Sequence, residues 1–361
     1  MNSRAHVVHI VPAPFDARDG IIGGAERYAL ELARHMAERC PTTLVSFGAA
    51  AREETIGKLR VRVIGHAHFV RGQRTNPIAS GLLRELRAAD IVHCHQQHVL
   101  SSSIAAIYGR AASKPVFVTD LGGGGWDISG YVCTDNWYRG HLHISEYSRA
   151  IAGQRDNPRA HVILGGVDTA KFVPDRSVTR DGSALFVGRL APHKGVDLLL
   201  EALPEDLRLV IIGRPYNEQY QSHLYDLAKN KRVEWRHDCD DASLVSAYKT
   251  ASCVVLPSVY ESSWSPRNIV PELLGQTLLE GMACGAGVIC TDVASMPEIV
   301  VDGECGLVVP PNDITALRSA LRKLTSDGQL ANSMGLKGRA RVLERFQWST
   351  VVDRCLALYA D

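Results

Sequence analysis

The sequence lacks three features that would assign a protein to a membrane, to the cell exterior or to nucleic acid. No part of its 361 residues approaches the ~18 consecutive apolar residues of a membrane-spanning helix. Its nine cysteines are scattered and include no C-x-x-C pair, which favours reduced thiols over a disulfide framework. A net charge of +1 gives no general attraction to nucleic acid. We therefore predict a cytoplasmic protein without a nucleic-acid partner; peripheral binding at the inner face of the membrane is the alternative, and the oligomeric state stays open.

Two phosphate-binding signatures are also missing. The sequence contains neither G-x-G-x-x-G, the fingerprint of dinucleotide-binding folds, nor G-x-x-x-x-G-K-[ST], the P-loop. Any phosphate group must therefore be bound by other glycine turns, by helix N-termini and by local basic side chains.

Apolar strand patterns alternate with helical patterns along the chain. Strands are expected at residues 6–11, 42–47, 59–64, 91–95, 116–120, 141–145, 184–190, 209–212, 233–236, 253–257 and 288–290. This alternation predicts parallel sheets covered by helices on both faces. The length favours two domains, which we place at residues 1–174 and 175–361, with a polar linker after Pro174.

A glycine pair ends the loop after the first predicted strand. Gly23 and Gly24 stand directly before a helical pattern that runs from Ala25 to Met36. A strand, a glycine-containing loop and a helix start allow a phosphate to approach the backbone in doubly wound folds. The alternative is that the two glycines only permit a turn.

Two glutamates flank another predicted helix start. An apolar stripe that includes Leu278 and Met282 predicts a helix from about Gly275, with Glu272 in the loop before it and Glu280 two turns inside. The amides of residues 275–277 and the helix dipole would attract an anion, and an ionised carboxylate on each side would accept hydrogen bonds from sugar hydroxyls. A nucleotide sugar has this arrangement of groups. The alternative is a pair of solvated acids on an amphipathic helix.

A basic turn follows the first predicted strand of the second domain. Arg189 and Lys194 lie on either side of Pro192, between the strand and the next helical pattern. Two cations at a helix start can bind a diphosphate, whereas a solvated loop is the alternative.

Three histidines follow another strand in the pattern H-x-H-x-x-H. His93, His95 and His98 could suggest a metal, but no acidic or thiolate ligand accompanies them at suitable spacing. We therefore expect no metal, and interpret these histidines as acceptor-side or core residues. Asp120 ends the next strand, directly before a run of four glycines.

These segments together resemble the family-four retaining glycosyltransferases. The signature E-x7-E appears here as E-L-L-G followed by L-E-G-M-A-C-G, and G-R-L-x-x-x-K-G resembles the family's diphosphate-binding turn. The resemblance implies a GT-B fold: an α/β protein of two Rossmann-like parallel-sheet domains facing each other across a cleft, with a C-terminal helix crossing back to the first domain. Family members usually have a histidine near the position of Asp120.

The resemblance also implies a reaction, which is metal-independent transfer of a sugar from a UDP- or GDP-linked donor to a hydroxyl of a glycan, a lipid-linked sugar or a small molecule. Glu272, Arg189 and Lys194 would act in catalysis. The acceptor side would include His95 and Asp120. The donor would contact Gly23, Gly24, Arg189, Lys194, Glu272, Leu274, Gly275, Gln276, Thr277 and Glu280.

Two other functions are compatible with the same residues. One is a GT-B sugar-nucleotide epimerase or hydrolase, and the other is a regulator that binds the nucleotide sugar without transferring it. The sequence identifies neither the sugar, the nucleobase nor the acceptor.

Overall fold

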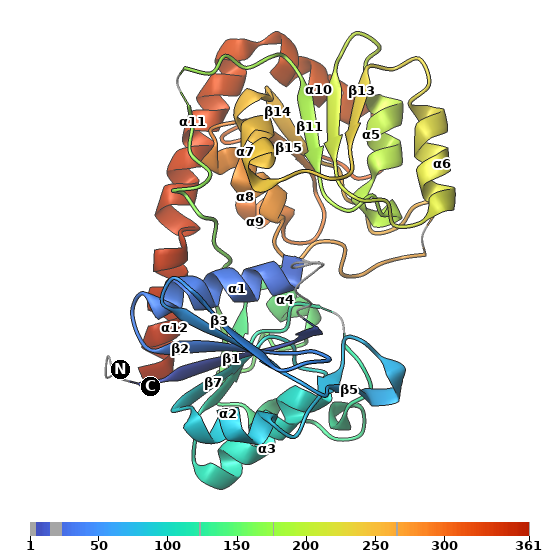
Figure 1. The fold of residues 1–361 in the computed structure, drawn as a ribbon. Coiled ribbons are helices and arrows are strands. Elements are labelled where there is room, and N and C mark those ends of the chain that lie inside the picture. Colours follow the sequence, from blue (N-terminus) through green and yellow to red (C-terminus); the bar gives the residue numbers. More distant parts are fainter. Residues whose placement is uncertain (1–4, 15–23, 123, 176, 265, 361) are drawn as a thin grey trace. The chain divides into compact units, whose positions relative to one another are not determined.

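The computed structural model describes residues 5–14, 24–122, 124–175, 177–264 and 266–360, and the chain divides into two compact units. Unit 1 comprises Met1–Gly166 together with Trp348–Asp361, and unit 2 comprises Val167–Gln347. Each unit contains one large β-sheet with helices packed against it (Figure 1). Among the helices of the described ranges, none combines the length and the hydropathy needed to span a bilayer.

Unit 1 is built on a sheet of eight strands in the order β10-β9-β8-β7-β1-β2-β4-β3. Neighbouring strands pair in parallel except for β3 and β4, which pair antiparallel. The strands are β1 (Val7–Pro14), β2 (Thr42–Phe47), β3 (Arg52–Ile56), β4 (Leu59–Ile64), β7 (Ile91–Cys94), β8 (Val116–Val118), β9 (Gly140–His143) and β10 (Ala160–Val162). The helices are α1 (Gly24–Ala37), α2 (Leu82–Ala88), α3 (Leu100–Ala112), α4 (Glu146–Ile151) and α12 (Trp348–Ala360).

Both faces of the unit 1 sheet are covered, because successive residues of a strand point to opposite faces. Ile10 of β1 belongs to a core cluster that includes Leu86 of α2 and Ala105 of α3. The next residue, Val11, belongs to a second cluster with Ala33 of α1. Helix α12 packs against α1. The arrangement is the helix-covered parallel sheet that the sequence predicts.

Unit 2 contains a sheet of six parallel strands in the order β13-β12-β11-β14-β15-β16. The strands are β11 (Ala184–Val187), β12 (Leu209–Ile212), β13 (Val233–Arg236), β14 (Cys253–Leu256), β15 (Gly287–Thr291) and β16 (Leu307–Val309). The helices are α5 (Val196–Ala202), α6 (Glu218–Leu227), α7 (Asp241–Thr250), α8 (Gln276–Ala283), α9 (Met296–Ile299), α10 (Ile314–Ser326) and α11 (Gly328–Arg345).

In each unit the strand order reverses, and this reversal marks the expected position of a ligand. In unit 2 the chain builds outward from β11 to β13 and then places β14 on the other side of β11. In unit 1, β7 similarly takes the side of β1 opposite to β2. Open α/β sheets bind ligands outside the carboxyl ends of the strands at such a reversal. The segments that follow β11, β14, β1 and β7 are therefore the first candidates for functional sites.

Unit 2 begins at Val167, ahead of the boundary that we expected near Pro174. The amide of Val167 donates to the carbonyl of Phe346 at the end of the same unit, at 2.8 Å. Phe172 is buried and packs edge-on against the ring of Tyr248. These contacts hold the segment before Pro174 in unit 2, although its sequence resembles a linker.

The C-terminal helix α12 returns to unit 1, as the GT-B fold predicts. Its Tyr359 hydroxyl hydrogen-bonds with Nδ1 of His93 in β7 at 2.6 Å. Trp348, the first residue of α12, packs against Gly166, where an added Cβ would come within 2.5 Å of the indole. Unit 1 therefore needs the end of the chain to complete its core.

Candidate active site

The predicted helix start at Gly275 is present in unit 2. Helix α8 begins at Gln276, and Gly275 precedes it with φ of 68°, in the left-handed region. A Cβ on Gly275 would lie 3.3 Å from both Ile299 and Leu278, so packing as well as backbone conformation favours glycine. The first amides of a helix have no acceptor within the helix, and the helix dipole makes this end positive.

Thr277 fixes the start of α8 at the strand reversal of unit 2. Its hydroxyl donates to the carbonyl of Val187, the last residue of β11, at 2.9 Å. Gln276 and Thr277 are half-buried, whereas Leu274 is buried in the core. Leu274 can therefore offer a ligand its backbone more readily than its side chain.

Glu272 lies in the loop before α8 and is 9% exposed. Its Oε1 accepts a hydrogen bond from Ser258 at 3.2 Å and forms an ion pair with Nζ of Lys194. Lys194 follows β11 and Ser258 follows β14. The two segments next to the strand reversal thus meet at one carboxylate, and two of the predicted site residues form a direct contact.

The basic turn is held close to the end of β14. Residues Pro192–Lys194 form a 3-10 turn, and Gly195 follows it with φ of 66°. A Cβ on Gly195 would lie 2.1 Å from the carbonyl oxygen of Pro257, so a side chain at this position would push the turn away. The amide of Val259 also donates to the carbonyl of His193 at 2.9 Å. These contacts determine where Lys194 lies.

His193 is a site residue that the sequence analysis did not identify. Its pKa is lowered to about 4, mainly by burial and also by the charges of Lys194 and Arg189, while the charge of Glu272 opposes the shift. Arg189 itself is exposed and forms no ion pair with any described residue. At neutral pH the turn therefore presents a neutral imidazole between two cations.

Glu280 is the fifth residue of α8, just over one turn from its start, and is 3% exposed. Its Oε2 accepts a hydrogen bond from the hydroxyl of Tyr248 in α7 at 2.8 Å. The sequence could not indicate Tyr248, because the two residues are 32 positions apart. The burial gives Glu280 a structural function, that of joining α7 to α8, beside the ribose contact that the resemblance implies.

In unit 1, Gly24 is the first residue of α1 and is exposed. A Cβ at this position would meet no atom within 4 Å. The described part of the protein therefore does not itself require glycine there. Gly23 lies outside the described residues.

The H-x-H-x-x-H motif is divided between the core and the surface of unit 1. His93 and His95 lie with His9 of β1 in a cluster that is at most 2% exposed, in which His9 Nδ1 and His95 Nε2 are 2.8 Å apart. Burial lowers the pKa of His9 to about 3 and the pKa values of the other two well below the usual range. Although their ring nitrogens lie within 4.8 Å of one another, a metal would have to break the His9–His95 hydrogen bond. His95 therefore lies in the interior of unit 1.

His98 lies beside Asp120 instead. Its Nε2 is 4.0 Å from Oδ2 of Asp120, whose Oδ1 accepts from the amide of Gly122 at 3.3 Å. Burial raises the pKa of Asp120, while His98 and the backbone amides partly oppose this shift. Both side chains follow strands at the carboxyl edge of the sheet, so His98 is better placed than His95 to meet a ligand with Asp120.

We expected no obvious D-x-D from the sequence, but Asp238 and Asp240 of unit 2 have this spacing. Asp238 forms an exposed ion pair with Arg214 at 2.9 Å. Asp240 caps helix α7 by accepting from the amide of Ser243. The two carboxylates thus have partners in the protein, and their spacing alone gives no indication of a metal.

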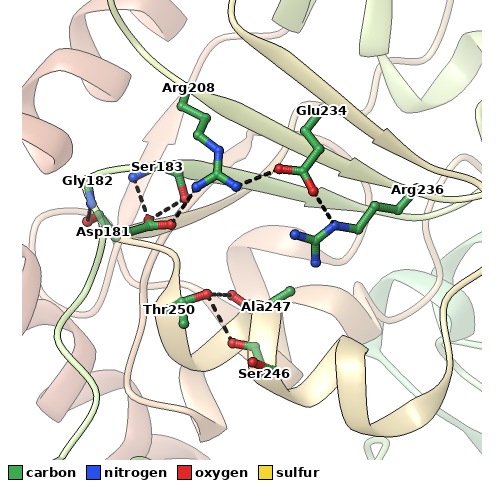
Figure 2. A network of polar contacts seen from close by, with 10 residues as sticks. Asp181, Gly182, Ser183, Arg208, Glu234, Arg236, Ser246, Ala247 and Thr250 are labelled. Carbon is green, nitrogen blue, oxygen red and sulfur yellow. Dashed lines mark hydrogen bonds and ion pairs between the residues drawn. The ribbon is translucent and has the colours of Figure 1, made fainter.

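Figure 2 shows a network of polar contacts in unit 2, most of whose residues line a pocket. It lies between strands β11 to β13 and helix α7, and its lining includes Asp181, Arg208 and Arg236. Arg208 donates to Asp181 and Glu234, and Arg236 donates to Glu234 at 2.7 Å (Figure 2). The hydrogen bond from Arg208 lowers the pKa of Glu234. Because these charges neutralise one another, we interpret the network as structural.

Comparison with known families covers nearly the whole chain. A family model described as "Glycosyl transferases group 1" matches residues 169–341, and one described as "Glycosyltransferase Family 4" matches residues 22–171. The chain belongs to glycosyltransferase family four. It is thus a retaining glycosyltransferase, and enzymes of this family use nucleotide-sugar donors, usually without a metal.

Two curated relatives and one solved structure illustrate the likeness. A GDP-mannose-dependent alpha-(1-6)-phosphatidylinositol monomannoside mannosyltransferase of Mycolicibacterium smegmatis is 31% identical over 57% of this chain and 58% of its own. A phosphatidyl-myo-inositol mannosyltransferase of Mycobacterium leprae is 27% identical over 97% of this chain and 95% of its own. The structure of Anabaena HepE in complex with UDP and glucose covers 98% of this chain and 99% of its own, with a TM-score of 0.74 and 16% identity. This family-four glycosyltransferase therefore has the GT-B fold.

Proposed function

We propose that unit 2 binds a UDP- or GDP-linked sugar at the carboxyl ends of β11 and β14, and that the sugar is transferred to an acceptor hydroxyl with retention at the anomeric carbon. The observation that carries this proposal is the contact of Lys194 with Glu272 beside the start of α8. A cation, a carboxylate and a helix N-terminus at one strand reversal provide the groups that a diphosphate and a sugar need.

The diphosphate would be bound by Lys194, by Arg189 and by the first amides of α8. These groups carry positive charge or partial positive charge, and they would stabilise the negative charge that develops on the leaving diphosphate. Gly275 would let the phosphate approach the backbone. Because the field is supplied by the protein's own groups, we propose that no metal is needed and that EDTA leaves activity unchanged.

Glu272 would contact the donor sugar near the reacting carbon. It is held by Ser258 and Lys194, so its carboxylate has a fixed orientation before the donor binds. We propose no protein nucleophile: a leaving-phosphate oxygen would accept the proton of the acceptor hydroxyl on the same face of the sugar. Glu280 would accept hydrogen bonds from the ribose hydroxyls.

Unit 1 would bind the acceptor, with His98 and Asp120 as its candidates at the carboxyl edge of the sheet. The names of the relatives mention GDP-mannose, UDP and phosphatidylinositol species, which supports UDP or GDP as the nucleotide and a lipid-linked acceptor. A glycan and a small molecule are the other acceptors that the sequence suggests. All nine cysteines lie in the described ranges and are free thiols, which supports a cytoplasmic location.

The experiment is incubation of the purified protein with UDP- and GDP-sugars, with and without candidate acceptors, while release of nucleoside diphosphate is measured. Release that depends on the acceptor supports transfer. Release without any acceptor would indicate a hydrolase, interconversion of the donor an epimerase, and binding without turnover a regulator.

Variants test the diphosphate assignment in the same assay. Lys194→Ala and Arg189→Ala should each lower turnover by about 100-fold or more, the scale of one lost transition-state charge contact. Lys229→Ala and Arg322→Ala are matched controls, because both side chains are exposed and ion-paired elsewhere in unit 2. Near-normal turnover in both test variants would refute the assignment.

A further inference from the structure

A short hairpin at the carboxyl edge of the unit 1 sheet has no function in the account so far. Strands β5 (His68–Phe69) and β6 (Pro77–Ile78) pair antiparallel, and the residues between them form a compact loop. The amide of Val70 donates to the carbonyl of Asn76 at 3.0 Å, and the amide of Gln73 donates back to Val70 at 3.0 Å. The hairpin follows β4, so it lies at the edge of the sheet where ligands bind.

Two amide side chains, the buried Asn76 and the exposed Gln73, fix this hairpin to the glycine-rich loop that follows β8. Asn76 is fully buried, and it donates to the carbonyl of Trp126 at 2.7 Å while accepting from the amide of Leu100 at 2.9 Å. Gln73 accepts from the amide of Trp126 at 2.8 Å. A Cβ on Gly125 would lie 2.7 Å from Gln73 and 2.8 Å from Asn76, so only glycine allows this contact. The two segments therefore have a fixed spacing.

This spacing exposes a set of residues that we call the Arg71 platform, made of Arg71, Arg74, Trp126 and Tyr131. The guanidinium of Arg71 lies 4.8 Å above the indole ring of Trp126. The indole nitrogen donates to the hydroxyl of Tyr131 at 3.1 Å, and Tyr131 is 71% exposed. Arg71 has a φ of 50°, an uncommon backbone conformation for a residue with a side chain and one that often marks a functional position.

No described carboxylate forms an ion pair with the arginines of the platform. Arg71 and Arg74 are both exposed, and neither forms an ion pair with a described residue. The carboxylate of Asp127, next to Trp126, is 3% exposed and accepts from Ser103 at 2.9 Å and from the amide of Ser129 at 3.1 Å. Two arginine side chains of one loop are therefore exposed to solvent, and that of Arg71 lies over an aromatic ring.

We propose that the Arg71 platform binds a phosphate group carried by the acceptor, so that the acceptor is a phosphorylated sugar or polyol. Arginine binds phosphate oxygens through paired hydrogen bonds, and stacking on Trp126 fixes the plane of the guanidinium before the ligand arrives. The exposed ring and hydroxyl of Tyr131 add a surface for the sugar or polyol. The inference rests on the proposed function, because it assigns the acceptor to unit 1.

The first test measures binding and needs no turnover. Ligand-observed NMR with glucose 6-phosphate should detect binding to the wild-type protein, while glucose should bind much more weakly. The double variant Arg71→Gln with Arg74→Gln should lose affinity for glucose 6-phosphate by about 10- to 100-fold, the scale of one lost charged hydrogen bond. Arg84→Gln is the matched control, since Arg84 is an exposed arginine on α2 of the same unit. Equal binding of the phosphorylated and neutral sugars by both proteins would overturn the proposal.

The second test compares acceptors in the transfer assay. Glucose 6-phosphate tests a soluble phosphate, and phosphatidylinositol in phosphatidylcholine vesicles tests a lipid headgroup. With either phosphorylated acceptor, kcat/KM of the double variant should fall by about 10-fold or more, and Arg71→Lys should fall less because it keeps the charge. UDP and GDP affinity should not change, which separates this result from a failure of the donor site. An equal rate in the double variant and the wild type would contradict the proposal.

Discussion

Single residues of unit 2 have partners that belong to distant parts of the chain. Lys194 and Glu272 are 78 positions apart, yet they form an ion pair because β11 and β14 are neighbours in the sheet. The same neighbourhood brings Ser258 to Glu272. The chemistry of the site therefore depends on side chains whose orientation is set before a donor arrives.

Glu280 can be tested for its two functions by comparing two variants. If it binds ribose, Glu280→Gln should raise the donor KM by about 5- to 30-fold with a smaller effect on kcat, since the contact is equal in ground and transition states. Tyr248→Phe removes its partner but keeps the carboxylate, and should change KM much less. A fall of Tm in both variants with unchanged KM would show that the pair only joins α7 to α8.

Buried histidines make the stability of the protein depend on pH. The pKa in the folded protein is about 3 for His9 and about 4 for His143, and burial is the main cause. The unfolded chain binds these protons near pH 6.5, so the stability is fully present above that pH and is lost as the pH falls toward the folded pKa values. Each group should contribute a loss of about 1.4 kcal/mol per pH unit between pH 6.5 and about 4.5.

Urea denaturation between pH 7.5 and 4.5 measures this slope. Removing one buried histidine, as in His143→Gln, should decrease the slope of the unfolding free energy against pH by about 1.4 kcal/mol per pH unit, which corresponds to one proton. His68→Asn, at an exposed site, controls for the loss of a histidine. A stability that is independent of pH in this window would contradict the burial-based explanation.

At the scale of elements, the sequence predicted the inner strands of the two large sheets but missed three of the four edge strands, β3, β10 and β16. Four strands have the predicted bounds, and two of them, Thr42–Phe47 and Leu209–Ile212, are buried along their whole length, as expected for strands covered on both faces. The antiparallel edge strand Arg52–Ile56 was not predicted. Its residues are mostly exposed, and Glu53 pairs with Arg60 and Arg62, so it carries no apolar pattern.

The candidate site could be predicted only in part for a related reason. Local spacing identified the helix start at Gly275 and both glutamates, because those features depend on neighbouring residues. Tyr248, His193 and Ser258 are brought to the candidate site by tertiary packing, which no local pattern in the sequence specifies. His95 was assigned to the acceptor side by its position at a strand end, but its pairing with His9 across two strands places it in the core.

The helix start can be tested with two glycines that share a backbone conformation. Gly275 has φ of 68° and Gly303 has φ of 72°, but only Gly275 has neighbours within 4 Å of an added Cβ. Both Gly→Ala variants should lose about 1 kcal/mol of stability from the left-handed backbone. Gly275→Ala alone should also weaken UDP or GDP binding, measured by calorimetry. Equal nucleotide affinity in both variants would show that the start of α8 does not bind the diphosphate.

At the scale of the whole molecule, the two units have separate strand reversals and separate candidate ligands. All residues assigned to the diphosphate and ribose lie in unit 2, except Gly23 and Gly24. A saturating nucleoside diphosphate should therefore slow amide hydrogen exchange in residues 189–195 and 274–280. The hairpin at residues 68–78 of unit 1 serves as the internal reference. If the nucleoside diphosphate slowed amide hydrogen exchange only in unit 1, the donor would bind there, and the assignment of donor and acceptor to the two units would be reversed.

The central claim is that Glu272 acts on the sugar, while its neighbours bind the diphosphate. The measurement that tests it most directly is kcat of Glu272→Gln together with the affinity of this variant for the free nucleoside diphosphate. Glu261→Gln is the control, because Glu261 is an exposed glutamate between β14 and α8. The account predicts that kcat falls by about 100-fold or more while diphosphate affinity stays within about threefold, since the free diphosphate lacks the sugar that Glu272 contacts. A near-normal kcat, or a loss of diphosphate affinity equal to the loss of kcat, would contradict it.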